Sequence, residues 1–278
     1  MKRFYFTIIV LLATLVANAQ TIKVYEYDDN GNLSNTPAYT SSKKVKVVFA
    51  EEQLSGNVAG HDWVDLGLPS GTLWATRNIG ALSDTDPGDY YAWGETIGSN
   101  DGKTAFNKNT YKTSLAKYNN NGNPDSKTVL EEQDDVANVK WQNGWRMPTL
   151  DEVRELLENC YIVGVNNYNN SGVEGIIVYK VKDSRDKGIK QALGVAEKKT
   201  YASYTLSDNH IFFPCSGSYS YNDGTQKTGL REIICWSSCL YNENDTQAYV
   251  LCFGTTNILT FYVSRYIGIS IRPVRSSK

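Results

Sequence analysis

The chain has 278 residues, of which 28 are lysine or arginine and 30 are aspartate or glutamate, so its formal net charge is −2. Because the sequence has no basic stripe that could neutralise several phosphates, its charge pattern excludes nucleic acid as the partner. The 22 glycines, 19 tyrosines and 6 tryptophans favour strands and loops over a helical bundle.

The first residues have the pattern of a secretory signal peptide, which is predicted to span residues 1–19. Lys2 and Arg3 precede an apolar run, and Ala17-Asn18-Ala19 forms a cleavage site of small residues. The run is short for a bilayer core of about 30 Å, and no later segment has the ~18 consecutive apolar residues of a membrane helix. We therefore expect an exported chain without a transmembrane segment, located in the periplasm, at the cell surface or in the extracellular medium.

Residues 20–57 are predicted to form a small N-terminal β-hairpin segment and a linker. Apolar and polar residues alternate over Thr21–Tyr27 and again over Lys43–Phe49, which is typical of strands with one buried face. Glu51–Gly60 is polar and contains glycine, as linkers do. The main domain is predicted to come next, over residues 58–278.

The main domain is expected to open with a strand and a long irregular excursion. Pro69 and Gly71 indicate a turn, and Thr72–Thr76 has the composition of a strand. Asn100–Asn138 is rich in Asn, Asp, Lys and Gly and has few apolar residues. A connection of this length in a compact domain is usually functional or disordered.

A helix is predicted to begin at Thr149. Thr149 and Glu152 have the spacing of a capping box, in which a hydroxyl and a carboxylate satisfy exposed backbone donors. The next apolar residues share one helix face, which we expect to pack on a sheet. They are Val153, Leu156, Leu157 and Cys160.

The C-terminal half contains segments of strand composition, separated by turns of Asn, Asp, Gly and Ser. These segments are Ile176–Val181, Tyr201–Leu206, Ile211–Pro214, Ile233–Ser237, Ala248–Phe253, Leu259–Val263 and Ile269–Val274. The last of them predict an antiparallel meander, and together with the helix they predict an α+β fold.

Five cysteines occur in a chain that is expected to reach a compartment where disulfides form. They are Cys160, Cys215, Cys235, Cys239 and Cys252. Their number is odd and their spacing follows no zinc pattern, so at least one thiol stays unpaired within a monomer. A bridge between Cys235 and Cys239 is an alternative, but buried free cysteines are the interpretation that we favour.

Four short motifs together resemble one family of secreted bacterial domains. The motifs are Val64–Ala75 (Val-Asp-Leu-Gly-Leu-Pro-Ser-Gly-Thr-Leu-Trp-Ala), Gly144–Thr149 (Gly-Trp-Arg-Met-Pro-Thr), Cys235–Ser238 and Gly268–Val274. They resemble the Fibrobacter succinogenes major paralogous domain, a family with a C-type-lectin-like fold, related to the Lcl C-terminal and sulfatase-modifying-factor-like branches. The resemblance implies an α+β domain with a twisted, mostly antiparallel sheet and one or two helices. It also implies that the first and last strands of the domain pair.

Arginine and tryptophan residues near these motifs are first expected to be structural. Arg146 at the helix entry is predicted to pair with backbone carbonyls or a carboxylate, and Arg272 is expected to support the last strand. Trp145 is expected to anchor the core. Trp141 is expected to do the same, although Trp141 or Tyr241 is an alternative candidate for an exposed ligand platform.

Catalytic groups are scarce in this sequence. His61 and His210 are the two histidines, and neither lies beside a nucleophile motif. The sulfatase-modifying branch oxidises cysteine, so a copper-dependent oxidase using Cys235 and Cys239 is one alternative. Calcium-dependent lectins hold the ion with oxygen ligands, which Asn242–Asp245 could supply. We expect no enzymatic activity, no metal and no cofactor.

The leading hypothesis is a non-enzymatic, exported ligand-binding or adhesion module that presents its C-terminal loops to an extracellular protein or glycan. Tyrosine supplies rigid contact area, and asparagine supplies adaptable hydrogen bonding. The predicted ligand-binding residues are Tyr219, Tyr221, Asn222, Tyr241, Asn242, Asn244, Asn257, Tyr262 and Tyr266.

Two further hypotheses concern this surface and its assembly. Between Cys235 and Val274, framework residues are interleaved with unrelated ones, which resembles the variable region of retroelement-diversified proteins on a lectin-like scaffold. The alternative class is a structural or assembly subunit of a surface layer or fimbria. In that case the N-terminal hairpin would add a strand to a neighbour's sheet edge, and the protein would self-associate.

Overall fold

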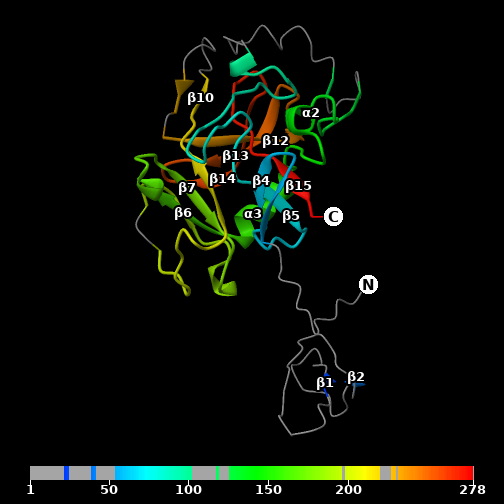
Figure 1. The fold of residues 1–278 in the computed structure, drawn as a ribbon. Helices are drawn as coiled ribbons and strands as arrows, with labels where there is room; N and C mark the ends of the chain where they lie inside the picture. The colour runs from blue at the N-terminus through cyan, green and yellow to red at the C-terminus, as the bar shows by residue number, and fades with distance from the viewer. Residues whose placement is uncertain are drawn as a thin grey trace. The chain divides into compact units, whose positions relative to one another are not determined.

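A computed structural model describes residues 22–24, 39–41, 54–101, 117–118, 125–195, 198–219, 227–229 and 231–277 of the chain. The chain divides into two compact units, Met1–Glu52 and Gln53–Lys278 (Figure 1). Among the described residues, no helix is long and apolar enough to cross a membrane.

In the first unit, two short strands pair antiparallel. β1 (Ile22–Val24) lies beside β2 (Tyr39–Ser41). β1 falls within the predicted first strand, but its partner comes earlier in the chain than the predicted second strand, Lys43–Phe49. That predicted strand lies outside the described residues. Tyr39 and Thr40 both favour strands, which explains why this segment can pair with β1.

The second unit opens with a four-stranded antiparallel sheet in the order β15-β5-β4-β3. Its strands are β3 (Ser55–Val58), β4 (His61–Val64), β5 (Thr72–Ala75) and β15 (Val274–Ser276). Ala59 and Gly60 form the two-residue turn between β3 and β4, with φ of 55° and 85°. The predicted linker Glu51–Gly60 therefore contains a strand, β3. β3 lacks a strong apolar pattern, and it forms because the turn brings it beside β4.

The predicted strand at Thr72–Thr76 pairs with the last strand of the chain, as expected. Trp74 of β5 lies opposite Val274 of β15. The last strand begins at Val274 rather than at the predicted Ile269. Ile269 instead makes a single antiparallel bridge with Tyr91, so this part of the segment pairs with a loop and not with β5.

A second four-stranded sheet has the order β8-β6-β7-β9. It contains β6 (Tyr161–Val165), β7 (Gly175–Tyr179), β8 (Lys190–Gln191) and β9 (His210–Pro214), with β8 parallel to β6 and the other pairs antiparallel. The predicted strand Tyr201–Leu206 is wrong. Asp186 is buried and accepts hydrogen bonds from the backbone N–H groups of Tyr201 and Ala202 and from the Tyr204 hydroxyl. These bonds hold the segment as a loop.

The predicted C-terminal meander is confirmed as a three-stranded antiparallel sheet. Its strands are β12 (Ile233–Leu240), β13 (Gln247–Phe253) and β14 (Ile258–Ser264), in that order. A short antiparallel pair, β10 (Ser218–Tyr219) and β11 (Lys227–Thr228), precedes it in the chain. The described residues thus have an α+β fold with mostly antiparallel sheets and two α-helices.

The two helices are α2 (Val136–Trp141) and α3 (Leu150–Asn159), and 3-10 turns occur at Ser99–Asp101, Tyr168–Asn170 and Ser184–Asp186. Asp135 caps α2 by accepting hydrogen bonds from the N–H groups of Ala137 and Asn138. The end of the predicted irregular excursion, Asn100–Asn138, is therefore helical. This helix is difficult to predict from the sequence, because α2 has 6 residues and its buried residues, Val136 and Ala137, lie in a mostly polar segment of the chain.

The β12-β13-β14 sheet separates two hydrophobic cores. Successive side chains of a strand point to opposite faces, so Leu251 and Phe253 enter the first core and Ala248 and Val250 enter the second. The first core also holds the predicted apolar face of α3, namely Val153, Leu156, Leu157 and Cys160. The second core includes Trp93, Trp236, Ile269 and Ile271. Because both faces are covered, much of this sheet is apolar at consecutive positions.

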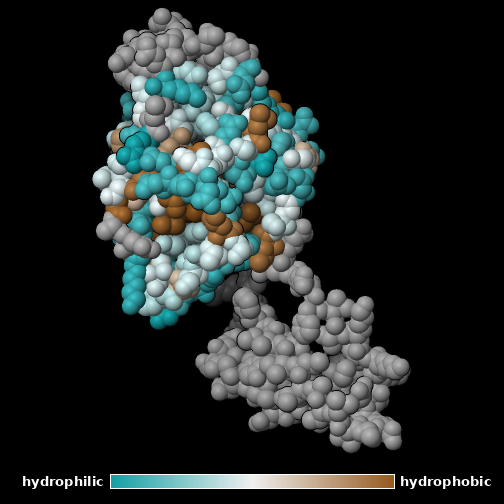
Figure 2. Space-filling model, turned by 60° about the vertical axis from the view of Figure 1, so that its left-hand side comes forward, coloured by the Kyte–Doolittle hydropathy of each residue, from teal (hydrophilic) through white to brown (hydrophobic). Residues whose placement is uncertain are grey.

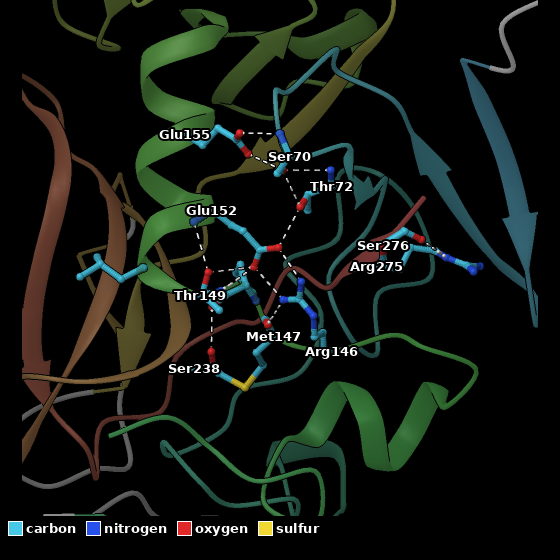
Figure 3. A network of polar contacts seen from close by, with 12 residues as sticks. Ser70, Thr72, Arg146, Met147, Thr149, Glu152, Glu155, Ser238, Arg275 and Ser276 are labelled. Atoms are coloured by element: carbon cyan, nitrogen blue, oxygen red, sulfur yellow. Dashed lines mark hydrogen bonds and ion pairs between the residues drawn. The ribbon is translucent and has the colours of Figure 1, made fainter. Parts of the chain in front are cut away.

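Helix α3 begins with the predicted capping box. The Thr149 hydroxyl accepts a hydrogen bond from the backbone N–H of Glu152, and the Glu152 carboxylate accepts one from the backbone N–H of Thr149. Arg146 donates two hydrogen bonds to the same carboxylate, at 2.6 and 2.5 Å, and the Thr72 hydroxyl donates another at 2.8 Å (Figure 3). The expected pairing of Arg146 with a carboxylate is confirmed. Burial tends to raise the pKa of Glu152, but the bonds from Arg146 and Thr149 outweigh it and lower this pKa to about 2.

The Glu152 carboxylate should make the stability of the protein depend on pH below neutrality. Because its pKa is lower in the folded chain than its ordinary value of 4.5, its stabilising contribution is complete above about pH 4.5 and is lost as the pH falls towards 2. We expect Glu152→Gln to lower the free energy of unfolding by about 3 kcal/mol at pH 7, a difference that shrinks towards zero near pH 2. Urea unfolding of both proteins across this pH range measures it, and a difference independent of pH would contradict the assignment.

Arg272 is a buried cation, with 1% of its side chain exposed. Its guanidinium donates hydrogen bonds to the side-chain oxygen of Asn78 and to the backbone carbonyls of Ala75 and Phe212, and it lies over the Phe213 ring. Burial lowers the pKa of Arg272 to about 10, so the group stays charged at neutral pH. The expected structural role of Arg272 is confirmed, since one side chain joins the end of β5 and the segment after it to β9.

We expect Arg272→Met to destabilise the protein by at least ~3 kcal/mol, because three buried oxygen acceptors would lose their donor. Arg231→Met is the matched control, since Arg231 is exposed and pairs with Glu174 at the surface. That control should cost less than ~1 kcal/mol. Equal losses for the two variants in urea unfolding would show that the buried hydrogen bonds do not carry the effect.

Candidate functional site

The structure brings together two of the predicted ligand-binding tyrosines. Tyr241 directly follows β12 and Tyr262 lies in β14, and their rings stack with centroids 3.8 Å apart. Tyr249 of β13 lies directly opposite Tyr262 in the strand register and meets Tyr241 edge-on at 5.4 Å. Residues opposite each other in neighbouring strands project to the same face, which explains why side chains distant in sequence meet here.

Phe261 extends this group of rings. Its ring lies 5.0 Å from that of Tyr262, nearly parallel to it, and 48% of its side chain is exposed. Tyr262 and Phe261 are neighbours in β14 and point to opposite faces of the sheet, so the rings of Tyr241, Tyr249, Phe261 and Tyr262 flank its edge on both sides. We call these four rings the aromatic surface. Sequence reasoning missed Tyr249 and Phe261 as site residues. Large side chains alternate along β13 and β14, and this pattern could have indicated that Tyr249 and Phe261 lie near the predicted tyrosines. It identifies them only when the strand register is known.

The turn between β12 and β13 borders the aromatic surface. Asn242 and Asn244 are exposed, as a ligand-binding role requires. The Tyr241 hydroxyl donates a hydrogen bond of 2.8 Å to the Glu243 carboxylate, and the bonds of Tyr241 to Glu243 and Tyr262 raise the pKa of Tyr241. Tyr241 is therefore an uncharged phenol at neutral pH. The Asn244 side-chain oxygen accepts two hydrogen bonds from Thr246, which fixes the turn.

The other predicted residues lie elsewhere. Asn257 is exposed in the turn between β13 and β14, at the opposite end of that hairpin from Tyr262. Tyr219 packs edge-on against Tyr90, with ring centroids 5.2 Å apart, and Tyr266 is partly buried against the second core. Asn257 and Tyr219 are therefore away from the aromatic surface. Tyr221 and Asn222 lie outside the described residues.

Strand β14 forms an edge of its sheet, and no other strand in the described part of the chain pairs with its outer side. The backbone N–H of Arg265, just after β14, donates a hydrogen bond to the carbonyl of Thr246, just before β13. Because hydrogen-bonded and non-hydrogen-bonded positions alternate along an antiparallel pair, this bond and the register show which residues of β14 bond to β13. In this alternation, Thr260 and Tyr262 turn their backbone N–H and C=O groups away from β13. Among the described residues nothing bonds to these groups, so β14 presents open backbone donors and acceptors beside the aromatic rings.

The edge strand is also uncharged and partly apolar at its surface. Its sequence is Ile-Leu-Thr-Phe-Tyr-Val-Ser, without a charged residue, proline or glycine. Leu259 and Phe261 expose 36% and 48% of their side chains. Figure 2, in which the left-hand side of Figure 1 comes forward, shows a band of hydrophobic side chains across the middle of that face. Soluble proteins usually protect such an edge with charges or proline, and β14 has neither.

The cysteines and histidines are held in structural positions. All five cysteines are free thiols, and the alternative bridge between Cys235 and Cys239 is not formed. Burial raises the pKa of Cys235 to about 12 and also raises that of Cys239, so neither is a reactive thiolate. His61 stacks on a tryptophan, and His210 bonds to a hydroxyl and a backbone carbonyl. Within the described residues, no three His, Cys, Asp or Glu side chains gather into a metal-binding group.

No family model matches the chain, and no curated protein or solved structure matches it.

Tyr262 should contribute to the order of the aromatic surface before any ligand binds. Its ring contacts both Tyr241 and Phe261, so we expect Tyr262→Ser to lower the free energy of unfolding by about 1 kcal/mol. Tyr262→Phe keeps the ring and should lie within ~0.5 kcal/mol of the natural protein. Urea unfolding measures both, and a serine variant as stable as the phenylalanine variant would show that the rings do not stabilise each other.

Proposed function

We propose that the protein is an exported, non-enzymatic binding module, of the family that its motifs resemble, which binds an extended segment of an extracellular protein along β14. One observation carries the proposal, namely that an uncharged, open sheet edge lies beside four aromatic rings. The edge offers a peptide a strand to pair with, and the aromatic surface offers its side chains a place to pack.

The free backbone groups of β14 supply general affinity for an extended chain. Thr260 and Tyr262 each present an N–H and a C=O group on the open side, so a partner strand can form a short ladder of hydrogen bonds. Peptide recognition by strand addition works in this way, with main-chain bonds giving affinity and pockets for alternate side chains giving selectivity.

The aromatic surface supplies selectivity. Phe261 and Leu259 lie on one face of β14 and Tyr262 lies on the other, so an added strand would meet apolar groups on both faces. Tyrosines lose little conformational entropy on binding, since only two side-chain torsions are fixed. The exposed amides of Asn242 and Asn244 border the site and can adapt their hydrogen bonds to the partner.

A peptide ligand uses more of these features than a glycan does. A glycan could stack on the rings and bond to the amides, but it would leave the backbone edge of β14 unused. A protein segment uses the edge, the rings and the amides together. The arrangement therefore favours a protein partner over a glycan.

An assembly subunit is the second candidate function, and the same edge favours it. β14 lacks the charges that normally prevent edge-to-edge pairing, so a strand from a second copy could fill the position. Deletion of residues 21–49 tests this function. Loss of self-association with a folded second unit would support assembly through the N-terminal hairpin, and unchanged sedimentation would count against it.

The binding function is tested by selecting ligands from a random linear peptide library on the purified mature protein. We expect selected peptides to bind the natural protein and to lose at least ~10-fold in affinity with Phe261→Lys, which places a charge in the aromatic surface. Thr260→Pro removes an outward N–H that β13 does not use and should have a similar effect, whereas Thr260→Val, the control, should bind normally.

Three outcomes would oppose this function. Peptides that bind both Phe261→Lys and Thr260→Pro normally would show that the edge is not the site. Binding confined to a glycan array and abolished by Tyr241→Ala would show that the aromatic surface holds a sugar. Binding abolished by a calcium chelator would point to the turn at Asn242–Asp245 as an ion site.

A further inference from the structure

A separate cavity of about 310 Å³ lies among three segments of the second unit. These segments are the turn and start of β4, the chain after β5, and the end of α2. The lining side chains on which a ligand would depend are His61, Asp62, Thr76, Arg77, Leu82 and Trp141. The cavity shares no residue with the aromatic surface, so a ligand bound in it is independent of the proposed function.

One wall of the cavity is aromatic and fixed. The His61 ring stacks on the Trp141 ring with centroids 3.7 Å apart and planes within 7°. Trp145 meets the Trp141 ring edge-on at 5.2 Å, and its Nε1 donates a hydrogen bond to the Val58 carbonyl. Burial lowers the pKa of His61, although nearby Asp62 opposes this, so the ring is neutral at pH 7. Trp141, the alternative candidate for a ligand platform, thus forms part of a wall that carries no charge.

The charged groups of the cavity are held in place by neighbours. Asp62 accepts a hydrogen bond of 2.7 Å from the Asn57 side chain, whose oxygen accepts one from the Gly60 backbone. Arg77 donates from Nε to Asp84 at 2.8 Å and from Nη1 to the Leu82 carbonyl at 3.2 Å. Because these bonds use only part of each group, Asp62 keeps one carboxylate oxygen and Arg77 keeps Nη2 without a partner among the described residues.

The remaining polar atoms include donors and acceptors in similar number. Asp62 accepts, Arg77 Nη2 and Trp141 Nε1 donate, and the Thr76 hydroxyl can do both. Within the described part of the chain, neither Trp141 Nε1 nor the Thr76 hydroxyl has a hydrogen-bond partner. A ligand that satisfies such a mixture must itself donate and accept, as hydroxyl groups do.

The charges around the cavity disfavour two other ligand classes. Asp62 and Asp84 flank Arg77, so the cavity has no net positive charge that would favour an anion. A cation would be repelled by the positively charged guanidinium of Arg77, which lines the cavity. A neutral ligand with several hydroxyl groups avoids both penalties, and its apolar face can pack on the aromatic wall.

We propose that this cavity binds a neutral sugar of about one or two rings. The volume is near the lower limit of the range that proteins use for small molecules, about 300 to 1,000 Å³. The aromatic wall contacts the C–H face of the sugar, and Asp62, Arg77, Thr76 and Trp141 bond to its hydroxyl groups. Leu82 lies at the rim of the cavity and is 87% exposed, so its apolar side chain is available to pack on the sugar ring.

The proposal is tested with the methyl glycosides of glucose, galactose, mannose and N-acetylglucosamine, added singly to the purified mature protein. Tryptophan fluorescence and saturation-transfer NMR monitor the titration, since Trp141 lies in the cavity wall. We expect at least one glycoside to bind saturably. Asp62→Asn and Arg77→Gln should each weaken that binding at least ~10-fold, because each removes a charged hydrogen-bond partner. Tyr262→Ser, which changes only the aromatic surface, should leave it unchanged.

Several results would contradict the sugar site. Failure of all four glycosides to saturate would overturn the proposal, as would unchanged affinity in Asp62→Asn and Arg77→Gln. Tighter binding of glucose 6-phosphate than of glucose would show an anion site instead. Asp62 and Arg77 lie near the surface, and circular dichroism of both variants verifies that the fold is retained. Loss of peptide binding along β14 would leave these results unaffected, so the two functions fail independently.

Discussion

The Glu152 carboxylate is the interaction on which the arrangement of the second unit depends. It accepts hydrogen bonds from Thr149 at the start of α3, from the Arg146 guanidinium and from Thr72 of β5. Arg146 also exchanges backbone hydrogen bonds with Val274 at the start of β15. One side chain therefore fixes the helix start against the first sheet, and α3 in turn covers one face of the β12-β13-β14 sheet. The sheet that carries the aromatic surface packs on α3, and the chain that lines one side of the cavity continues from β5, to which Thr72 belongs. Such fixed supports suit sites that must be formed before a ligand arrives.

The sequence predicts those elements of the fold whose cause is local. The start of α3 follows from Thr149 and Glu152 alone, because a capping box needs only four neighbouring residues. The C-terminal meander follows from composition. The strand predicted at Tyr201–Leu206 fails because Asp186, fifteen or more positions earlier, binds that segment as a loop, and tertiary contacts override strand propensity. β3 escapes prediction because its turn depends on Ala59 adopting a positive φ, which the residue type does not favour.

The candidate site is predictable in the same partial way. Tyr241 and Tyr262 can be chosen from residue type, because tyrosine is suited to binding surfaces. That Tyr249 joins them, and that Tyr219 does not, depends on strand register and on which face each side chain occupies. A shift of one residue in the β13-β14 register would reverse these faces, so composition cannot decide the matter. The cavity beside Trp141 is not predictable either, because it is assembled from three segments that are adjacent only in the folded chain.

The unpaired thiols can report where the folded structure opens. Burial raises the pKa of Cys160 and Cys235 to about 12 and that of Cys215 and Cys252 to about 11, so almost none is thiolate at neutral pH while the chain is folded. Alkylating reagents react with thiolates, so Cys160 and Cys235, which are both buried, become reactive only when the structure around them separates. Cys160 and Cys235 lie in the first core and Cys252 packs against the second. Modification of Cys160 and Cys235 therefore reports the opening of the core between α3 and the β12-β13-β14 sheet.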